Sequence, residues 1–210
     1  MADLAERRKD LLDSMMRDAI YEGAVAVLSS HGLNGATMDR VAAAAGVAKG
    51  TLYNHFRNKR DLLLFVHART VEPLDEATDE IIAGEMSAIE KLTRLSRVWR
   101  EELSKRRVAF EFLIRDSAAR DILMDDKNTG RSRAIRRVAR VIEQGIQAGE
   151  FRSLDPLRVG EIFVGATIGM TEEEFVCGEQ RSHEETTDVL IDVFLNGLVA
   201  NQGSRGHQEG

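Results

Sequence analysis

Only two prolines, Pro73 and Pro156, interrupt the 210 residues of this chain. Proline disrupts helix interiors, whereas the many Ala, Leu, Glu and Arg residues favour helix. No segment alternates β-branched and polar residues between Asn-Gly or Asp-Gly turns, as the strands of a hairpin would. No internal repeat is visible either. These features predict an all-α protein.

Composition limits the class of protein. Hydrophobic residues make up 43% of the chain and charged residues 30%, which is too apolar for a disordered protein. No run approaches the about 20 apolar residues that span a membrane, and the charged N-terminal segment does not fit a signal peptide. Cys177 is the only cysteine, so it has no partner for an internal disulfide. We expect a cytoplasmic protein that has no membrane contact, metal or cofactor.

Helix start and stop signals in the first third of the chain predict short helices. Gly32 suits the end of a first helix, Thr37 suits the N-cap of a second, and Gly46 ends that second helix. Asn58 can cap a later helix, with Asp61 as an imperfect substitute for the Glu or Gln of a capping box. The predicted helices cover residues 18–28 with an apolar pattern that extends toward residue 4, then 37–45, 48–56 and 58 onward. Two short helices joined by a glycine-containing turn and braced by longer ones indicate a helix-turn-helix.

The charge distribution supports a nucleic-acid surface in this region. Residues 1–60 hold nine Lys/Arg and seven Asp/Glu, a balance of +2, while residues 61–210 hold 20 and 28, a balance of −8; together they give the net −6. Positions 40 to 60 contain no acidic residue but five basic ones, Arg40, Lys49, Arg57, Lys59 and Arg60. Such a cluster can neutralise phosphates even on a protein that is acidic overall.

The segment 18–64, and above all its stretch AGVAKGTLYNHF (residues 45–56), resembles the N-terminal domain of tetracycline-repressor (TetR) family transcriptional regulators. The resemblance implies a three-helix DNA-binding domain with a helix-turn-helix at residues 1–67. It also implies a larger helical ligand-binding and dimerisation domain at residues 68–201, which leaves a flexible tail at 202–210. One departure is Ala48, where the family usually places a residue able to cap the recognition helix. The missing cap is worth about 1 kcal/mol, so we expect that helix to fray until DNA binds.

The resemblance also implies roles for individual side chains. Thr37 would offer its hydroxyl and nearby N–H groups to a phosphate at a helix N-terminus, and Thr51 would present a methyl and a hydroxyl to base edges. Gly50 would let the backbone come close to the DNA, while Tyr53 would reach a phosphate through its hydroxyl. The full set of predicted DNA-binding residues is Thr37, Arg40, Lys49, Gly50, Thr51, Tyr53, Asn54, His55 and Lys59, with Leu52 and Phe56 assigned to the core.

Each role has a structural alternative. The ring of Tyr53 could pack on the first helix, and the lysines and arginines could form an ordinary solvated face. The stretch 7–9, Arg-Arg-Lys, could form an arm that enters the minor groove. We favour an ordered helical extension there, because Glu6 and Asp10 offset its charge.

The helix predicted from residue 58 is expected to run through residues 62–84, and five further helices are predicted at residues 87–105, 108–124, 131–149, 156–178 and 183–201. Pro73 falls inside the 62–84 segment and is expected to kink or split it, as a bend rather than a hinge. Asp155 can cap a helix that has Pro156 in its first turn. The last two helices carry wide apolar stripes, and the resemblance implies that they pair with their copies across a two-fold axis to form a homodimer.

A pocket for an unknown small-molecule effector is expected among residues 87–177, where large apolar side chains gather. The candidate ligand-binding residues are Trp99, Phe110, Leu113, Met124, Phe163 and Met170, with Phe112 as a further large side chain; ordinary core is the alternative for each. Several arginines could bind an anionic effector, but their spacing around the helices places most of them on the surface: Arg94, Arg97, Arg100, Arg106, Arg107 and Arg115.

Two other patterns are weaker site candidates. The run Glu172-Glu173-Glu174 with Glu179 and His183 could hold a metal, but an acidic loop is favoured because no second histidine is near. Cys177 could cross-link two copies or sense oxidants, although a lone thiol without an adjacent basic group is usually inert.

These observations together predict a sequence-specific regulator of transcription that binds double-stranded operator DNA. The favoured interpretation is a homodimeric repressor that a small molecule releases. An activator, an all-helical enzyme that uses Glu and His residues, and a helix-turn-helix that docks a protein are the alternatives. No Ser/His/Asp, Cys/His or metal-spaced set of residues supports the enzyme.

Overall fold

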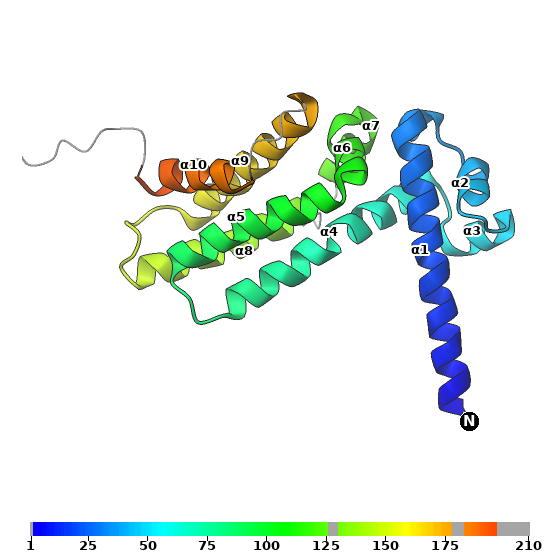
Figure 1. Ribbon diagram of the computed structural model, residues 1–210, viewed down its shortest axis with the longest axis horizontal. Coiled ribbons are helices and arrows are strands. Elements are labelled where there is room, and N and C mark those ends of the chain that lie inside the picture. The colour runs from blue at the N-terminus through cyan, green and yellow to red at the C-terminus, as the bar shows by residue number, and fades with distance from the viewer. Residues whose placement is uncertain (1, 126–129, 178–182, 197–210) are drawn as a thin grey trace, which may run out of the picture.

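The computed structural model describes residues 2–125, 130–177 and 183–196, and within these ranges it contains ten α-helices and no strand (Figure 1). The all-α prediction is confirmed. The helices are α1 (Ala2–Gly35), α2 (Met38–Ala44), α3 (Lys49–His55), α4 (Lys59–Ala83), α5 (Ala88–Lys105), α6 (Arg107–Arg115), α7 (Ser117–Asp125), α8 (Gly130–Gln147), α9 (Pro156–Cys177) and α10 (His183–Asn196).

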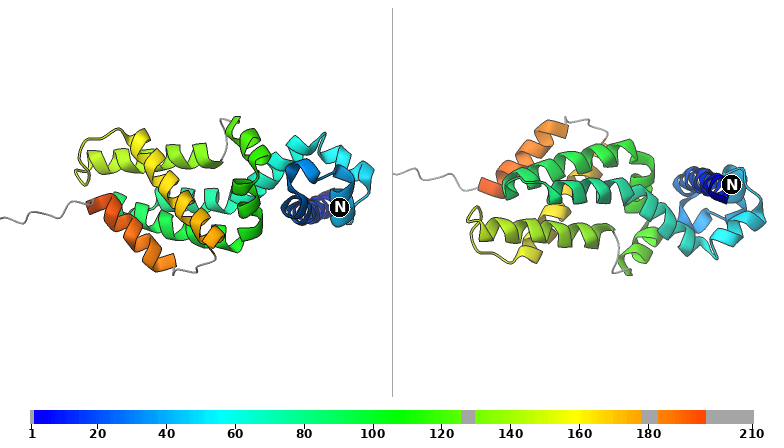
Figure 2. Two further views of the ribbon diagram at one scale, coloured as in Figure 1. Left: turned by 90° about the horizontal axis from the view of Figure 1, so that it is seen from above. Right: turned by 90° about the horizontal axis from the view of Figure 1, so that it is seen from below.

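The molecule is elongated, with α1, α2 and α3 forming a lobe at one end (Figures 1 and 2). The long helix α4 begins in this lobe and runs into a larger body that contains α5 to α10. The most extensive packing in that body is between α8 and α9. We call the two parts the small lobe and the large lobe.

Each lobe has its own main hydrophobic cluster. The small-lobe cluster joins α1 to α4 around fully buried side chains such as Ile20 and Leu52. The large-lobe cluster joins α4, α5, α8 and α9 around Leu92 and Phe163. Side chains of α6 and α7 belong to the small-lobe cluster although they come much later in the chain: Phe112, Leu113, Ala119 and Leu123. The first core therefore includes residues from beyond position 67.

Helix α1 is longer than the predicted 18–28 segment. Its first part projects away from the rest of the molecule (Figure 1), and Leu4, Leu11 and Met15 there are 60–77% exposed. The expectation of a helical extension over residues 7–9, rather than an arm, is confirmed. At its other end Gly32 has φ 65° and ψ 172°, a conformation that only glycine adopts readily, and it breaks the helix at the predicted stop.

The helix-turn-helix forms as its caps and turn residues predict. The Thr37 hydroxyl accepts a hydrogen bond from the Arg40 N–H at 3.2 Å, which caps α2. Gly46 has φ +67°, and the N–H groups of Gly46 and Val47 donate to carbonyls of the last turn of α2. Ala48 makes no side-chain cap at α3, and the Asn58 side chain caps α4 by accepting from the Asp61 N–H at 2.9 Å.

One predicted helix is wrong, because residues 108–124 form two helices rather than one. The backbone leaves the helical region at Asp116 (φ −75°, ψ 111°), and its Oδ1 accepts from the Ala119 N–H at 2.9 Å, so Asp116 ends α6 and caps α7. The apolar pattern runs on through this break, which hid it. Helix α4 is not split at Pro73, which lies inside it.

The other large-lobe helices agree with their predicted ranges to within a few residues. Helix α5 begins with a capping box between Ser87 and Glu90, and Gly149 ends the turn after α8 with φ 77°. The predicted tail, 202–210, and the end of the last predicted helix lie outside the described residues. No helix in the described ranges is both long and apolar enough to cross a membrane.

Candidate functional site

The outer face of the small lobe collects most of the predicted DNA-binding side chains. On α3, Leu52 is fully buried in the small-lobe cluster, whereas Tyr53 is 45% exposed. Thr51 is half-buried, and the remaining predicted side chains of α2 and α3 are exposed: Thr37, Arg40, Lys49, Asn54 and His55, with Gly50 open to solvent. Tyr53 is therefore not a core residue, which weakens the alternative that its ring only packs on α1.

The basic cluster is less free than the sequence suggested. Lys49 Nζ lies 2.8 Å from Asp39 Oδ1, with both side chains 61% exposed, because the fold brings the start of α3 against the first turn of α2. This acid lies one position before the range 40–60 that contains no acidic residue. The hydrogen bond that Lys49 donates to the Asp39 carboxylate raises the pKa of Lys49 above its ordinary value. Lys49 Nζ also lies 6.0 Å from the centre of the Tyr53 ring.

Two other predicted phosphate ligands hold the end of α1. Lys59 is half-buried, and its ammonium donates to the carbonyl oxygens of Leu33 at 2.9 Å and Asn34 at 3.3 Å. The Arg40 guanidinium donates to the Gly35 carbonyl at 3.1 Å. Cations suit these carbonyls, which lie at the negative end of a helix. Both side chains thus position the segment that leads into α2.

The same segment is held from the large-lobe side by Asp116. Its Oδ2 accepts from the Leu33 N–H at 2.9 Å, while Oδ1 caps α7. A single carboxylate therefore joins the break in α1 to the junction of α6 and α7. Sequence reasoning missed this residue, although an aspartate followed by Ser117 and two alanines is a helix-start signal.

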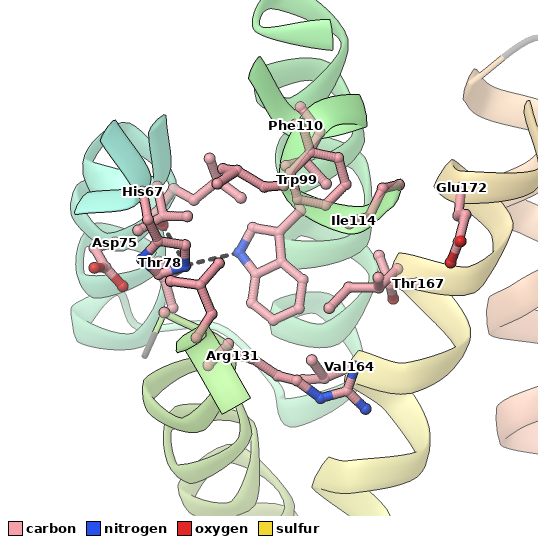
Figure 3. Close-up of a pocket in the computed structure, with 18 of the residues that line it drawn as sticks. His67, Asp75, Thr78, Trp99, Phe110, Ile114, Arg131, Val164, Thr167 and Glu172 are labelled. Atoms are coloured by element: carbon pink, nitrogen blue, oxygen red, sulfur yellow. Dashed lines mark hydrogen bonds between the residues drawn. The ribbon is translucent and has the colours of Figure 1, made fainter. Parts of the chain in front are cut away.

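A second feature, a cavity of about 350 Å³, lies inside the large lobe between α4 and α9 (Figure 3). Trp99 stands in the middle of its lining side chains, and its indole N–H donates to Thr78 Oγ1 at 2.7 Å. The Thr78 hydroxyl in turn donates to the Leu74 carbonyl at 2.5 Å. The walls are mostly apolar, and four lining residues carry charged side chains: Asp75, Arg120, Arg131 and Glu172.

The cavity includes three of the six predicted ligand-binding residues, Trp99, Phe110 and Leu113. Phe163 is fully buried instead and packs edge-on against Trp99, with ring centres 6.2 Å apart. Met170 is half-buried and not among the lining residues. The side chain of Met124 lies outside the described residues. Phe112 belongs to the small-lobe cluster.

The α4 side of the cavity lies outside the predicted range of residues 87–177. His67, Val71, Leu74, Asp75 and Thr78 all come from α4. At 25 residues, α4 is long enough to contribute side chains to both lobes.

The weaker site candidates gain no support. Among the described residues no group of three or more His, Cys, Asp or Glu side chains could hold a metal. Glu179 and the side chains of Cys177 and His183 lie outside the described residues. Of the candidate arginines, Arg100 is an exception to the predicted surface location: it is 2% exposed and forms an ion pair with Glu174.

Comparison with known proteins identifies the family. Residues 20–66, which span most of the small lobe, match the family described as bacterial regulatory proteins, tetR family. Residues 20–66 therefore carry the DNA-binding domain of the TetR family of transcriptional regulators. The chain is accordingly a DNA-binding protein rather than an enzyme, and residues 20–66 include the helix-turn-helix.

Related proteins match this chain over most of its length. It is 26% identical over 200 residues to the HTH-type transcriptional repressor KstR2 of Mycolicibacterium smegmatis, covering 90% of this chain and 93% of that one. It is 25% identical over 191 residues to the fatty acid metabolism regulator protein of Bacillus subtilis (85% and 93%). The fold also matches the transcriptional regulator FadR from Bacillus subtilis, solved in complex with stearoyl-CoA, with a TM-score of 0.76 and 20% identity over 86% of this chain and 98% of that chain.

Proposed function

We propose that this TetR-family regulator is a homodimeric repressor that binds an operator through α2 and α3 and is released by a small molecule in the large-lobe cavity. The observation that carries the proposal is the two-sided character of α3. Its apolar residue Leu52 is buried, while Lys49, Tyr53 and Asn54 point outward at the far end of the molecule from the cavity. A short helix with one face packed and the other polar suits insertion into a major groove.

The proposed DNA contacts divide by chemistry. Gly50, Thr51 and Asn54 would lie against base edges or the nearby backbone, and Tyr53 and Thr37 would donate to phosphates. Lys49, Arg40, Lys59 and His55 would add charge and hydrogen bonds along the sugar-phosphate backbone. Since two donors of Lys59 are already used on α1, one N–H remains for a phosphate.

Exposed apolar residues on the last two helices support the homodimer. Ile162 of α9 is 63% exposed, and Val189 and Val193 of α10 are 59% and 39% exposed. Apolar side chains that recur on neighbouring helices mark surfaces that a partner covers. A two-fold axis through α9 and α10 would bury them against their copies and present two recognition helices about 34 Å apart.

The cavity and the relatives support release by a ligand with an apolar part. One relative is named for fatty acid metabolism, and the fold relative was solved with stearoyl-CoA. Helices α6 and α7 line the cavity through Leu113 and Leu123, and the same side chains pack in the small-lobe cluster. A ligand that binds one arrangement of these helices more tightly than the other would shift the population between operator-binding and released forms.

The DNA surface is tested by fluorescence anisotropy with the duplex upstream of the gene, over a salt series of about 50 to 200 mM. Tyr53→Ala should weaken binding about tenfold or more if its hydroxyl meets a phosphate. Lys49→Ala should make the salt slope shallower by about one. Lys105→Ala is the matched control, because Lys105 is another exposed, ion-paired lysine but lies at the end of α5. If Lys49→Ala and Lys105→Ala bind the duplex with the same affinity and salt slope, the DNA-binding surface lies elsewhere. Binding that does not depend on salt would favour a protein-docking role.

The dimer is tested by sedimentation at micromolar concentration. Val189→Asp should give monomers, because it places a charge in the proposed interface. Val108→Asp is the control, since Val108 is equally exposed at 59% but lies on α6. A parent protein that sediments as a monomer would contradict the homodimer.

A further inference from the structure

The cavity wall is suited to a hydrocarbon chain because its hydroxyl groups are already engaged. The Thr78 hydroxyl accepts from Trp99 and donates to Leu74. The Thr167 hydroxyl donates to the Phe163 carbonyl at 2.9 Å. These hydroxyl groups are therefore not available to donate a hydrogen bond to a ligand. The walls favour an apolar ligand surface over a polar one.

The charged side chains that line the cavity differ in how they are neutralised. Asp75 accepts from Arg133 at 2.6 Å and also pairs with Arg137, so the protein already balances this carboxylate. Arg120 makes one long contact, 3.4 Å, to the Ile114 carbonyl. In contrast, no hydrogen bond or ion pair engages Arg131 within the ranges that the structure describes.

The position of Arg131 makes this unengaged charge relevant to the cavity. The residue lies in the first turn of α8, and its side chain crosses toward α9 beside Val164 (Figure 3). It is exposed, so a ligand head can reach it from solvent. Glu172, the other carboxylate among the lining residues, lies beyond Thr167 in the same view, apart from the Arg131 guanidinium.

We propose that Arg131 anchors the anionic head of an amphipathic ligand whose hydrocarbon chain fills the cavity. A guanidinium binds a carboxylate or a phosphate through two parallel hydrogen bonds, and both occur on lipid metabolites. The cavity volume of about 350 Å³ is near the lower end of the range for small-molecule sites, so a chain fits inside while a bulky head such as a nucleotide stays outside at Arg131. The inference rests on the proposed function only in assigning this cavity to the effector.

Trp99 provides a direct readout, because it is the only tryptophan in the chain and lines the cavity. Its fluorescence is followed while the full-length protein is titrated with dodecanoate, dodecanoyl-CoA and dodecanol, each below its micelle concentration. The variants are Arg131→Ala and Arg131→Lys. The control is Arg136→Ala, which removes an exposed arginine of α8 that does not line the cavity. Thermal unfolding of each variant establishes that it is folded.

We expect Arg131→Ala to weaken binding of at least one anionic probe about tenfold or more, the factor that follows from losing a charge-assisted hydrogen bond. Dodecanol binding should not change. Arg131→Lys should be intermediate, because it keeps the charge but loses the paired geometry. The anionic probe that responds identifies the head group as a carboxylate or as the phosphates of a thioester.

Three results would overturn the proposal. These are anionic probes that bind Arg131→Ala and Arg136→Ala equally well, dodecanol that loses as much affinity as the anions, and no saturable fluorescence change with any probe. Operator release is measured separately by anisotropy. If binding of a probe depends on Arg131 but the protein stays on the operator, the role of Arg131 stands and release by the ligand is wrong. The two hypotheses can therefore fail separately.

Discussion

Replacing Asp116 by alanine tests whether one carboxylate joins the two lobes. The change removes two hydrogen bonds of 2.9 Å, one from the Leu33 N–H and one from the Ala119 N–H. Loss of the helix cap costs about 1 kcal/mol, and loss of a bond from a half-buried amide to a charged group costs about 1.5 kcal/mol or slightly more. We therefore expect the free energy of unfolding to fall by about 2 to 3 kcal/mol. For a chain of this size that corresponds to a melting temperature lower by about 4 to 12 °C.

The assay is thermal unfolding followed by circular dichroism, combined with hydrogen exchange of the Leu33 amide. Exchange of that amide should accelerate in Asp116→Ala, because its acceptor is gone. Asp116→Asn should lose less stability, since its amide oxygen can still accept one of the two bonds. The control is Asp121→Ala, which removes an exposed carboxylate of α7. A free energy of unfolding for Asp116→Ala within about 0.5 kcal/mol of the value for Asp121→Ala would refute the reasoning.

Three further changes test other parts of the structure. Asp39→Asn should strengthen operator binding several-fold at low salt, because it removes a negative charge that pairs with Lys49; anisotropy measures this. Gly23→Ala should destabilise the fold by about 1 to 3 kcal/mol in chemical denaturation, because a Cβ there would lie 2.6 Å from the Ala45 nitrogen. The hydrogen bonds in the α5 capping box lower the pKa of Glu90 below 4.5, so its stabilising effect is complete above pH 4.5 and is lost as the pH falls through the lowered value. Melting curves of the parent and Glu90→Ala should therefore converge in acid.

Each of these has a control or a contrary outcome. If Asp39→Asn still increases operator affinity at high salt, the increase is not electrostatic in origin. Gly50→Ala should not destabilise the fold, since nothing lies within 4 Å of a Cβ at that position. The Gly23 argument fails if both alanine variants unfold alike. Glu90→Gln, like Glu90→Ala, should lack the loss of stability in acid that protonation of Glu90 causes. If the difference in melting temperature between the parent and Glu90→Ala stays constant down to about pH 3, the role given to Glu90 is wrong.

Local signals were sufficient for much of the fold. Thr37, Gly46 and Asn58 each specify a cap or turn through their own chemistry, so the helix-turn-helix follows from a short window of sequence. The break at Asp116 was hidden because apolar periodicity continues across it and because half of its hydrogen bonding goes to Leu33, 83 positions earlier. Periodicity cannot report a contact of that range.

The charges were the least predictable part of the candidate site. The pairing of Lys49 with Asp39 depends on the angle between α2 and α3, and the engagement of Lys59 by Leu33 depends on how α4 meets α1. Neither angle is encoded by spacing along one helix. The buried location of Arg100 likewise depends on Glu174, which lies 74 positions away on α9.

The shared use of α6 and α7 limits how this protein can be recombined with its relatives. The core of the small lobe is completed by three side chains from α6 and α7: Phe112, Leu113 and Leu123. A domain graft with its junction at residue 67 would replace all three. A chimaera that joins residues 1–67 to the effector-binding part of another regulator would exchange these three side chains for whatever that donor supplies. Successful grafts should therefore carry the 107–125 segment along with the amino-terminal portion, at the expense of altering one wall of the new effector pocket.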